Sequence, residues 1–503
     1  MKFKIKKFFL LSTIFILLLF SLSLVINFSS SFNKSIVYLK KYVPLPIKIY
    51  LKENFFSDLI KEENLKLKEE VFNLERSVRF LENQYLDLQS QINGVKTNKF
   101  KYKLIRYQLP FHQAKNWGTK SVSYLEEYEN KIIYTTGNGQ IFYSDLDTLV
   151  NKKELELNKI NTNLDQIIKD PAFWDLDEKV NVTLSKIDEK IAGRSGILGN
   201  MIGVTSILID KNYFYLAYVQ EIKKYCYHIG LLRAEMNFKK MFFEEFLDHT
   251  NPDECARADI LNNDYSFNGK VSGGKLSTYK DEKILLSIGS FGLMENLFDD
   301  NNKFGKIIEI DTKTKKTKSL SKGHRNQQGL IYHQKNDMIL STEHGPKGGD
   351  EINIINEGKN YGWPDASYGI EYNPYLQAVG LKKSHKEHGY EEPVYYFSTS
   401  IGISDIIEIP ANFDPSIEKD FLVGSLTGSA TYGNTLANER YTNNKTAGRS
   451  LFRVSFNEKF SKIKEVERIY LGDRIRDIHY IENNNFFLLL FEEQPAIGIF
   501  EKF

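Results

Sequence analysis

Residues 323–364 read GHRNQQGLIYHQKNDMILSTEHGPKGGDEINIINEGKNYGWP, and the interpretation of the whole chain starts from this stretch. Two segments that alternate apolar and polar residues lie within it, so its charged groups fall at strand ends. Gly345-Pro346 and Gly348-Gly349 are typical turn residues, and the acidic pair Asp350-Glu351 follows directly. The stretch therefore predicts β-strands that carry a polar site at one end.

The polar residues of this stretch indicate the kind of ligand. Backbone carbonyls exposed by a Gly-Pro turn, together with a carboxylate, suit a hard cation such as calcium. Arg325 brings the opposite charge, and its planar guanidinium is suited to a ligand carboxylate. An anionic ligand with a bound cation is the simplest interpretation that accounts for both features.

From about residue 100 onward, short β-rich runs alternate with turns that contain Gly, Asn and Asp. The expected strands are 131–136, 140–145, 206–210, 213–219, 283–287, 306–311, 338–342, 405–409, 421–425, 451–455, 477–481 and 486–491. Such repeated meanders are typical of two sandwiches, a barrel or a propeller. A strand, a Lys-Asn or Asn-Asn turn and a second strand recur at 330–342 and 478–490, which favours a propeller. Residues 165–176 and 238–248 are expected to be short helical or loop insertions.

Four blocks in one order resemble a known family: 323–330, 342–353, 359–364 and GDRIRDI at 472–478. They look like the calcium-dependent pyrroloquinoline quinone (PQQ) sugar dehydrogenases, the glucose and sorbosone dehydrogenase family. The resemblance extends from about Gly269 to Phe503. It implies an all-β, six-bladed β-propeller, a number of blades that periodicity alone does not supply.

The resemblance also implies roles for individual residues. Those that match cofactor contacts are Arg325, Asn326, Arg474, Arg476 and, more loosely, Asn138. Those that match calcium positions are Gly345, Pro346, Glu351 and Tyr361. Structural alternatives stay open: Asp473 and Asp477 could neutralise the late arginines on the surface, Asp350 and Glu351 could cap the turn, and Tyr361 and Trp363 could be core aromatics.

The general base of the family is not found at its expected place. The family block resembles HSGGRL, whereas this chain reads VSGGKL, so Val271 stands at the histidine position and Lys275 at the arginine position. Ser290 stands near a position that tends to be acidic, and Thr427 near a lysine that some members direct at the cofactor. The other histidines that could supply a base are His228, His249, His324 and His344. Because loss of a general base typically costs ~10²–10⁴ in rate, slow or absent turnover is expected.

The N-terminal region predicts a membrane anchor. Lysines at positions 2, 4, 6 and 7 precede an almost unbroken apolar run over residues 8–28, which is long enough to span a bilayer. No convincing cleavage site follows, so an uncleaved anchor is favoured over a removed signal. The basic residues before the span place the N-terminus in the cytoplasm and the remainder in the periplasm or outside the cell. We assign 1–30 to the anchor and 31–57 to a linker.

Residues 58–94 predict a helical rod. Apolar residues recur alternately four and three apart over four heptads from Ile60 to Ile92, with charged residues on the other faces. This pattern specifies a coiled coil, and Asn64 at an a-type position favours a homodimer. A single amphipathic helix packed on the large domain is the alternative, although so narrow a seam leaves little apolar surface for that. Residues 95–503 are then the propeller.

Composition excludes some classes of function. The formal net charge is +2, so nothing indicates a nucleic-acid partner, and neither CxxC nor HExxH occurs, so there is no zinc pattern. Cys226 and Cys255 are the two cysteines. They could form a disulfide outside the cytoplasm or remain two isolated buried thiols, and the sequence does not decide between these.

Two functions of different classes are therefore compatible with the sequence. The first is a membrane-anchored, PQQ- and calcium-dependent aldose dehydrogenase with an altered base, which oxidises a sugar outside the cytoplasm. The second is a propeller that serves as a binding or scaffold module on a dimeric stalk and performs no turnover. The retained arginines and Gly-Pro turn favour the first, and Val271 favours the second.

Overall fold

The structure, a computed structural model, describes part of the chain. The described residues are 95–96, 101–109, 123–168, 203–223, 225–247, 255–257, 267–294, 297–346, 348–369, 382, 384–426, 447–492 and 495–502. The predicted anchor, linker and coiled coil (1–94) lie outside them. Within the described residues, no helix is both long enough and apolar enough to cross a bilayer.

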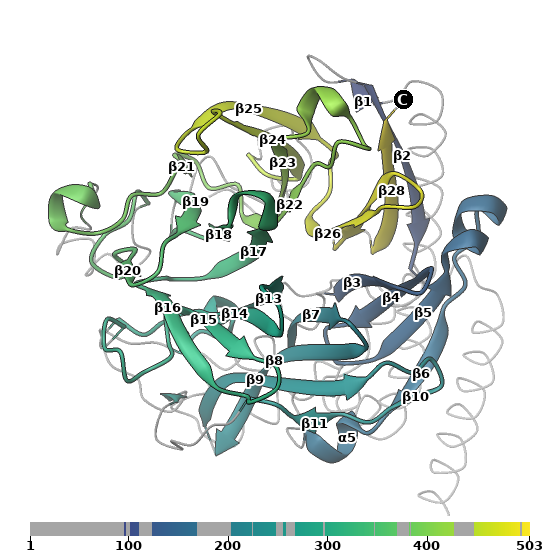
Figure 1. The fold of residues 1–503 in the computed structure, drawn as a ribbon, viewed down its shortest axis with the longest axis horizontal. Helices are drawn as coiled ribbons and strands as arrows, with labels where there is room; N and C mark the ends of the chain where they lie inside the picture. The colour runs from purple at the N-terminus through teal and green to yellow at the C-terminus, as the bar shows by residue number, and fades with distance from the viewer. Residues whose placement is uncertain are drawn as a thin grey trace, which may run out of the picture. The chain divides into compact units, whose positions relative to one another are not determined.

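Six β-sheets surround one axis (Figure 1), and each forms a blade whose first strand lies innermost. The innermost strands are β3 (Ser123–Tyr128), β7 (Val204–Asp210), β13 (Gly273–Tyr279), β17 (Gln327–His333), β22 (Ile403–Glu408) and β26 (Ile475–Ile481). Each innermost strand contacts the next, and β26 contacts β3, so the ring is closed. The predicted six-bladed, all-β propeller is therefore confirmed. Each blade is named below by its innermost strand.

The second and third strands continue each blade outward by antiparallel pairing. The second strands are β4 (Lys131–Thr136), β8 (Tyr213–Lys223), β14 (Lys283–Ile288), β18 (Met338–Glu343), β23 (Asp420–Ser425) and β27 (Phe486–Phe491). The third strands are β5 (Ile141–Asp145), β9 (Cys226–Glu235), β15 (Lys306–Asp311), β19 (Asp350–Ile355), β24 (Ser450–Phe456) and β28 (Ala496–Lys502).

The outer strands are less regular than the inner ones. They are β6 (Asn158–Thr162), β11 (Glu244–Glu245), β16 (Thr317–Lys322), β21 (Tyr395–Phe397), β25 (Ile463–Tyr470) and β2 (Lys101–Gln108), with the short additions β1 (Val95–Lys96), β10 (Lys240–Met241), β12 (Ala256–Arg257) and β20 (Lys359–Asn360). The helical turns are η2 (Thr148–Lys152), α5 (Leu164–Ile167), η4 (Gly269–Val271), η5 (Gln334–Asn336), η6 (Lys386–His388) and η7 (Pro415–Ile417).

The core lies between neighbouring blades, as β27 illustrates. Phe487, Leu489 and Phe491 pack with residues of the β22 blade. Leu488 and Leu490 point to the opposite face of the sheet and pack with the β3 blade. Because alternate residues of a strand face opposite sides, a strand covered on both sides is apolar throughout. That is why the FFLLLF run of β27 does not alternate.

The first and last described strands close the propeller together. β2, from the N-terminal side, pairs antiparallel with β28, from the C-terminus, over the register Tyr102↔Lys502 to Gln108↔Ala496. Lys103 and Glu501 form an ion pair of 2.8 Å across the same two strands. The β26 blade is thus built from both ends of the domain.

The predicted strand positions agree closely with the structure. β4, β15 and β27 have the expected bounds, and α5 confirms a helical turn at the start of the 165–176 insertion, the remainder of which lies largely outside the described residues. The prediction of a helical or loop insertion at 238–248 is wrong in part, because β10 and β11 lie there. β10 pairs parallel with β6 and β11 pairs with β9. Pairing with a sheet edge distant in sequence is not visible in a local pattern.

Cys226 and Cys255 form a disulfide with a Cα–Cα distance of 5.3 Å, so the disulfide alternative holds. Cys226 begins β9, and the neighbouring strand β12 follows Cys255 directly. The pairing of β12 with β9 places Arg257 opposite Cys226 and brings the two cysteines together.

Candidate functional site

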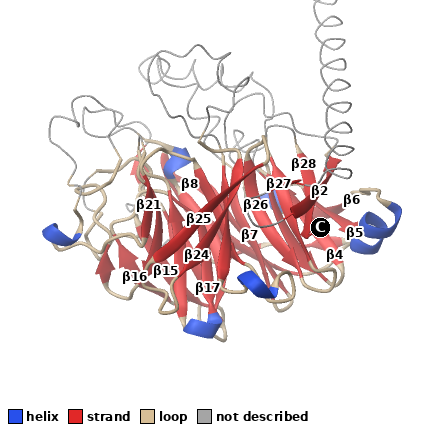
Figure 2. Cartoon of the chain, turned by 90° about the horizontal axis from the view of Figure 1, so that it is seen from above, coloured by secondary structure: helices blue, strands red, loops and turns tan. Residues whose placement is uncertain are grey.

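Topology gathers the predicted site residues at one end of the propeller. The strands run between its two ends (Figure 2), and consecutive strands are antiparallel. The start of each innermost strand and the connection between the second and third strands therefore lie at the same end. The segments found there include Asn138, Val271, Arg325-Asn326, Gly345-Pro346, Arg474 and Glu492.

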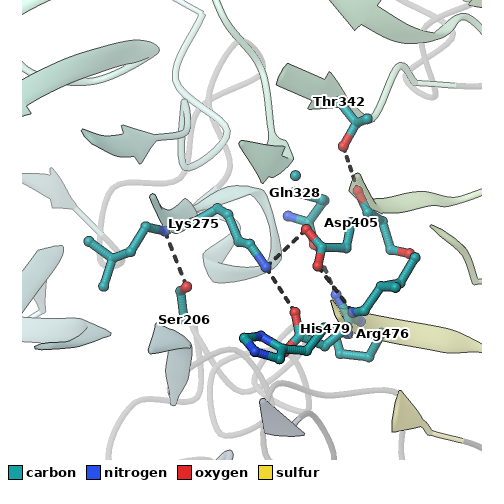
Figure 3. A network of polar contacts seen from close by, with 12 residues as sticks. Ser206, Lys275, Gln328, Thr342, Asp405, Arg476 and His479 are labelled. Carbon is teal, nitrogen blue, oxygen red and sulfur yellow. Dashed lines mark hydrogen bonds and ion pairs between the residues drawn. The ribbon is translucent and has the colours of Figure 1, made fainter. Parts of the chain in front are cut away.

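The innermost strands are irregular at this end. In five of the six, the register with the second strand shifts by one residue close to the start, which is the signature of a β-bulge. The residues at the shifts include Thr205, Lys275, Gln328, Asp405 and Arg476, which we call the bulge residues. A bulge re-aims a side chain. Four of the bulge residues form a polar layer beneath the candidate site (Figure 3).

Arg325 lies against the Gly-Pro turn. Its Nη1 donates to the carbonyl oxygens of His344 and Gly345, each at 3.2 Å. Its guanidinium carbon lies 5.2 Å from the ring centre of Trp363. Among the described residues its side chain has no carboxylate partner. The residues that line the cleft at this point include Arg325, Glu343, His344, Gly345, Glu351 and Trp363.

Asn326 and Arg476 are joined by a residue that the sequence did not single out. The Oδ1 of Asn326 accepts from the amide N–H of Gly273 at 3.1 Å and from the Nε2 of Gln328 at 3.0 Å. The Oε1 of Gln328 accepts from the Nη1 of Arg476 at 2.9 Å. Three blades, those of β13, β17 and β26, are thereby linked at the floor of the site.

The two late arginines share one buried carboxylate. The Nε atoms of Arg474 and Arg476 both pair with Glu492, at 2.7 Å and 2.5 Å. These two cations hold the pKa of Glu492 below its usual value, despite burial. The alternative in which Asp473 and Asp477 neutralise the pair on the surface is wrong. Both arginines are largely buried, and among the described residues both pair with Glu492.

The aspartates of the GDRIRDI block have other partners. Asp473 pairs with Arg106 of β2 at 3.3 Å. Asp477 pairs with Lys275 at 2.8 Å, and Lys275 also lies 2.9 Å from Asp405 (Figure 3). One ammonium thus joins the β13, β22 and β26 blades beneath the cleft. These attractions raise the pKa of Lys275 above its usual value although burial opposes them.

The pKa of His344 is lowered by burial together with three of the arginines. Burial is the main cause that lowers the pKa of His344 to about 3, followed by repulsion from Arg325, Arg476 and Arg474. Its imidazole is therefore neutral at pH 7. Residues from the β17 and β26 blades, far apart in sequence, jointly make this end of the axis electropositive.

The Gly-Pro turn is held by Asp350. Its Oδ1 accepts from the amide N–H of Gly345 at 3.1 Å, and its Oδ2 accepts from that of Ile401 at 2.8 Å. Asp350 therefore has the capping role that one alternative gave it. The turn is too tight for a side chain at Gly345, where a Cβ would lie 2.3 Å from the carbonyl oxygen of Gly349. The carbonyl of Gly345 is left to face Arg325.

Glu351 and Tyr361 both border the cleft, but the structure uses them differently. Burial and the nearby Glu343 raise the pKa of Glu351 well above its usual value. The hydroxyl of Tyr361 donates to the carbonyl oxygen of Ile354 at 2.5 Å, and its ring stacks on His324 with centres 4.7 Å apart. The Tyr361 side chain is thus a core aromatic. In the described part of the chain, no three His, Cys, Asp or Glu side chains are grouped as a metal site.

Asn138 lies in the β4–β5 turn at the same end. It is buried, and its Oδ1 accepts from the hydroxyl of Thr136 at 2.6 Å. Its amide oxygen is thus used within its own turn, and the structure gives no contact between Asn138 and the arginines. Thr427 and His249 lie outside the described residues.

Val271 occupies η4, directly before β13, and is buried. Its carbonyl accepts from the amide N–H of Phe291 at 2.8 Å, and the neighbouring Ser290 donates its amide N–H to the carbonyl of Arg325 at 2.8 Å. The position that matches the family's base is therefore linked to the backbone of Arg325 through residues 290–291, and it carries no titratable group.

Of the described histidines that the sequence offered as substitutes for the base, His344 alone borders the cleft. His324 is buried between Ser321 and Glu343, at 2.8 Å and 2.9 Å. His228 is buried in β9 beside Phe304.

Sequence reasoning missed Gln328, Glu492 and Asp405. Gln328 lies within the block 323–330, two residues after Asn326, and reaches the axis only because β17 bulges there. Glu492 follows β27, and nothing in its neighbours distinguishes it from a surface glutamate. A search for polar residues at the start of each expected innermost strand could have found Gln328 and Asp405.

Comparisons with known proteins agree on one family. Residues 174–497 match the family described as Glucose / Sorbosone dehydrogenase. Aldose sugar dehydrogenase YliI of Escherichia coli K12 is 37% identical over 106 residues, which cover 21% of this chain and 28% of that protein. Quinoprotein glucose dehydrogenase B of Acinetobacter calcoaceticus is 51% identical over 45 residues, 9% of each chain. The matched stretches thus span under a third of these relatives.

Solved structures share the fold. The apo form of soluble aldose sugar dehydrogenase from Escherichia coli superposes with a TM-score of 0.54 at 16% identity, covering 80% of this chain and 100% of that one. The PQQ-bound aldose sugar dehydrogenase of Streptomyces coelicolor gives 0.50 at 14% identity, covering 80% and 98%.

Proposed function

Because the chain belongs to the glucose/sorbosone dehydrogenase family, we propose that its cleft binds PQQ and that the protein acts on an aldose sugar outside the cytoplasm. The observation that carries the proposal is the placing of two arginines around Asn326: Arg325 precedes it in the chain, and Arg476 is joined to it through Gln328. The lowered pKa of His344, to which repulsion from these arginines contributes, agrees with this. PQQ is a flat quinone with three carboxylates, and a cleft that binds it needs an excess of fixed positive charge.

The residues present fit an anionic cofactor. Arg325 lacks a carboxylate partner among the described residues, and Arg474 and Arg476 share the single carboxylate of Glu492. The indole Nε1 of Trp363, buried at the cleft, also has no acceptor in the described structure. Arg325, Asn326, Arg474 and Arg476 would hold the carboxylates and ring edge of PQQ. When bound, PQQ supplies a quinone that accepts hydride.

Calcium is the second proposed cofactor, and its binding depends on where the Arg325 side chain lies. The carbonyls of Gly345 and Pro346 are hard oxygen donors of the kind calcium takes, and Glu351 borders the same cleft. The Gly345 carbonyl already accepts from Arg325. A cation at Gly345 therefore competes with the guanidinium, and we expect calcium to bind together with the anionic cofactor that draws Arg325 away. Tyr361 would contribute its backbone, since its hydroxyl is engaged.

We expect turnover to be slow or absent. Oxidation of a sugar C–H(OH) group releases a proton from the hydroxyl as hydride leaves the carbon. Val271 cannot accept this proton, and the lowered pKa of His344 makes it a weak base. Loss of a general base typically costs ~10²–10⁴ in rate.

Reconstitution tests the proposal. The purified protein is titrated with PQQ, with and without calcium, while the absorbance of the bound quinone is followed, and aldoses are then added with a dye acceptor. Saturable binding that calcium strengthens supports the proposed cofactors, and binding without dye reduction supports an inactive site. Absence of binding at any calcium concentration would remove the quinoprotein function.

Restoring the base tests why turnover is lost. We predict that Val271→His raises dye reduction by about 10²-fold or more, because an imidazole then stands at the position that matches the family's base. Val271→Ala is the matched control, since it opens the same space without a base and should leave the rate unchanged. An equal gain in both variants would refute the explanation.

The second candidate function is a non-catalytic propeller held on a dimeric stalk, and Val271 is the observation that favours it.

In either case we propose that residues 1–30 anchor the chain and that 58–94 dimerise it, with the propeller periplasmic or extracellular. The disulfide supports this location, because disulfides persist in oxidising compartments. Light scattering tests the dimer by measuring the molar mass of the detergent-purified protein. We expect a dimer for the full chain and a monomer for a variant that lacks residues 58–94.

A further inference from the structure

Gln328 joins two segments that are distant in the sequence. Its Oε1 accepts from the Nη1 of Arg476, 148 positions away, at 2.9 Å. Its Nε2 donates to the Oδ1 of Asn326 at 3.0 Å and to the carbonyl oxygen of Gln327 at 3.3 Å. Both ends of the amide are therefore hydrogen-bonded. If the amide were rotated by half a turn, its NH₂ group would face the donor of Arg476 and its oxygen would face the acceptor of Asn326, so both hydrogen bonds would be lost.

The backbone prepares this geometry. Gln328 is the extra residue of the bulge in β17, and Arg476 is the extra residue of the bulge in β26. Both side chains are therefore turned toward the axis, where Figure 3 shows them together. Two bulges on different blades that meet at one hydrogen bond indicate a built contact, because each bulge interrupts a ladder of backbone hydrogen bonds.

Among the described residues, the Arg476 side chain has one partner besides Gln328. Its Nε pairs with Glu492, which also holds Arg474. A single contact at Nε leaves a guanidinium free to turn about that contact, whereas a second one at Nη1 defines its plane. Arg325 is held in a comparable way by two carbonyls.

We propose that Gln328 is a positioning residue, whose amide fixes the plane of the Arg476 guanidinium relative to Asn326 so that a carboxylate of the cofactor meets a preset donor pair. The inference rests on the proposed function for the identity of the ligand. The positioning itself is independent of PQQ, because every contact that carries it lies within the protein. Preset donors cost less ordering on binding, and this is the physical source of the effect.

Two variants separate positioning from charge. Gln328→Met keeps the length of the side chain and removes both hydrogen bonds. Gln328→Glu keeps an acceptor for Arg476 but loses the donor to Asn326 and adds a negative charge beside an anion site. Tyr332→Phe is the matched control on the same strand, because its hydroxyl bonds to Asp337 at the exposed end. Melting temperatures of all variants establish that they fold.

A ligand-free readout tests the positioning. The full-length chain is labelled with phenylglyoxal, and the rate of modification of each arginine is measured by peptide mass spectrometry. We expect Arg476 to react several-fold faster in Gln328→Met than in the parent, while Arg233 of the β7 blade keeps its rate and Tyr332→Phe matches the parent. Unchanged reactivity of Arg476 would overturn the inference. This result does not depend on whether the protein binds PQQ.

A binding readout tests the consequence. The dissociation constant for PQQ is expected to rise by roughly 10- to 100-fold in Gln328→Met, the range that loss of a hydrogen bond to a charged group produces, and by more in Gln328→Glu. In a background of Arg476→Met, the same Gln328→Met change should alter the constant by less than about twofold, because Gln328 then has no guanidinium to position. A full effect in that background would overturn the inference. A parent that binds no PQQ would instead refute the proposed function and leave the labelling result to decide.

Discussion

At the scale of single residues, the site rests on buried ion pairs and on hydrogen bonds that cross from one blade to another. Lys275 lies between Asp405 and Asp477, and Arg476 lies between Glu492 and Gln328. Removing one partner of a buried pair is costly, because it leaves an uncompensated charge. The polar layer beneath the cleft is therefore stabilised by paired charges, each of which would destabilise the fold if it were buried without its partner.

Glu126 of β3 lies beside this layer, and within the described part of the chain it has no Lys or Arg ion-pair partner. The nearest atom of His479 is 3.8 Å away. Burial and the charge of Asp477 raise the pKa of Glu126 to about 8, and burial lowers the pKa of His479 to about 4. Burial also raises the pKa of Asp405, whereas Lys275 opposes this.

These shifts predict how stability depends on pH. The folded state binds the Glu126 proton more tightly than the unfolded state. The free energy of unfolding therefore falls as the pH rises from the pKa of Glu126 in the unfolded chain to its pKa of about 8 in the folded protein. The lowered pKa of His479 makes the free energy of unfolding rise with pH, but only up to about pH 6.5, where this histidine is largely neutral in the unfolded chain as well. The free energy of unfolding should therefore fall between pH 6.5 and 8 by roughly 1 kcal/mol or more, since one pKa unit corresponds to ~1.4 kcal/mol.

Glu126→Gln should make that fall smaller, because the amide does not ionise, while Asp405 and Glu351, whose pKa values burial also raises, keep their own contributions. Urea unfolding of parent and variant at pH 6.5 and 8 measures the difference. A parent and variant with the same pH slope would show that Glu126 is not the group responsible. Glu129→Gln in the neighbouring exposed turn is the control and should keep the parent's slope.

At the scale of elements, the bulges decide which side chains reach the axis. The ordinary alternation of a strand would send neighbouring residues to opposite faces. The extra residue in β13, β17, β22 and β26 brings Lys275, Gln328, Asp405 and Arg476 into one layer instead. β3 has no such shift near its start.

The disulfide is the second feature that acts at this scale. It closes a loop of 29 residues between β9 and β12. Removing a cross-link of this span from the chain should lower the free energy of unfolding by about 3–4 kcal/mol, chiefly by enlarging the unfolded ensemble. The double variant Cys226→Ala with Cys255→Ala should show this loss in denaturant unfolding.

Reductant supplies the control for the disulfide. Reduction should destabilise the parent by a similar amount and leave the double variant unchanged. A parent that is insensitive to reductant under unfolding conditions would contradict the expected contribution of the cross-link.

At the scale of the whole propeller, closure depends on β2. This strand covers the edge of β28, and Tyr102 packs between Phe413 of the β22 blade and Phe500 of β28, with ring centres 6.1 Å and 4.6 Å away. Arg106 contributes the ion pair to Asp473 beside the late arginines. One strand thus connects the closure of the ring to the floor of the site.

Deletion of residues 1–109 should therefore unfold or aggregate the domain, because it exposes the edge of β28 and uncovers apolar side chains. Deletion of residues 1–94 retains β2 and should leave the propeller folded. Circular dichroism and size-exclusion chromatography distinguish the two outcomes. A monomeric, β-rich protein after the longer deletion would show that closure by β2 is dispensable.

Much of the fold was predictable from local pattern. β4, β15 and β27 follow from short apolar runs between turn residues, and the hairpins at 330–342 and 478–490 follow from their Lys-Asn and Asn-Asn turns. The segments at 240–245 were not predictable as strands, because edge pairing with β6 and β9 creates them. Residue type and spacing singled out Arg325 and the Gly-Pro turn, and the structure places them in contact, although their role as site residues stays a prediction.

The sequence by itself determined most of the strands and the polar blocks, because residue type and short-range spacing carry this information, and the resemblance to the family implies that Val271 stands where a basic histidine is expected. Only the tertiary structure decided that Arg474 and Arg476 share Glu492, that Gln328 joins Asn326 to Arg476, and that Lys275 bridges two aspartates. The contacts of Gln328 and Lys275 cross blades and depend on one-residue bulges, whereas Glu492 reaches the two arginines from the turn that follows the neighbouring strand β27. A bulge changes the direction of a side chain without leaving a signal in the local order of residues.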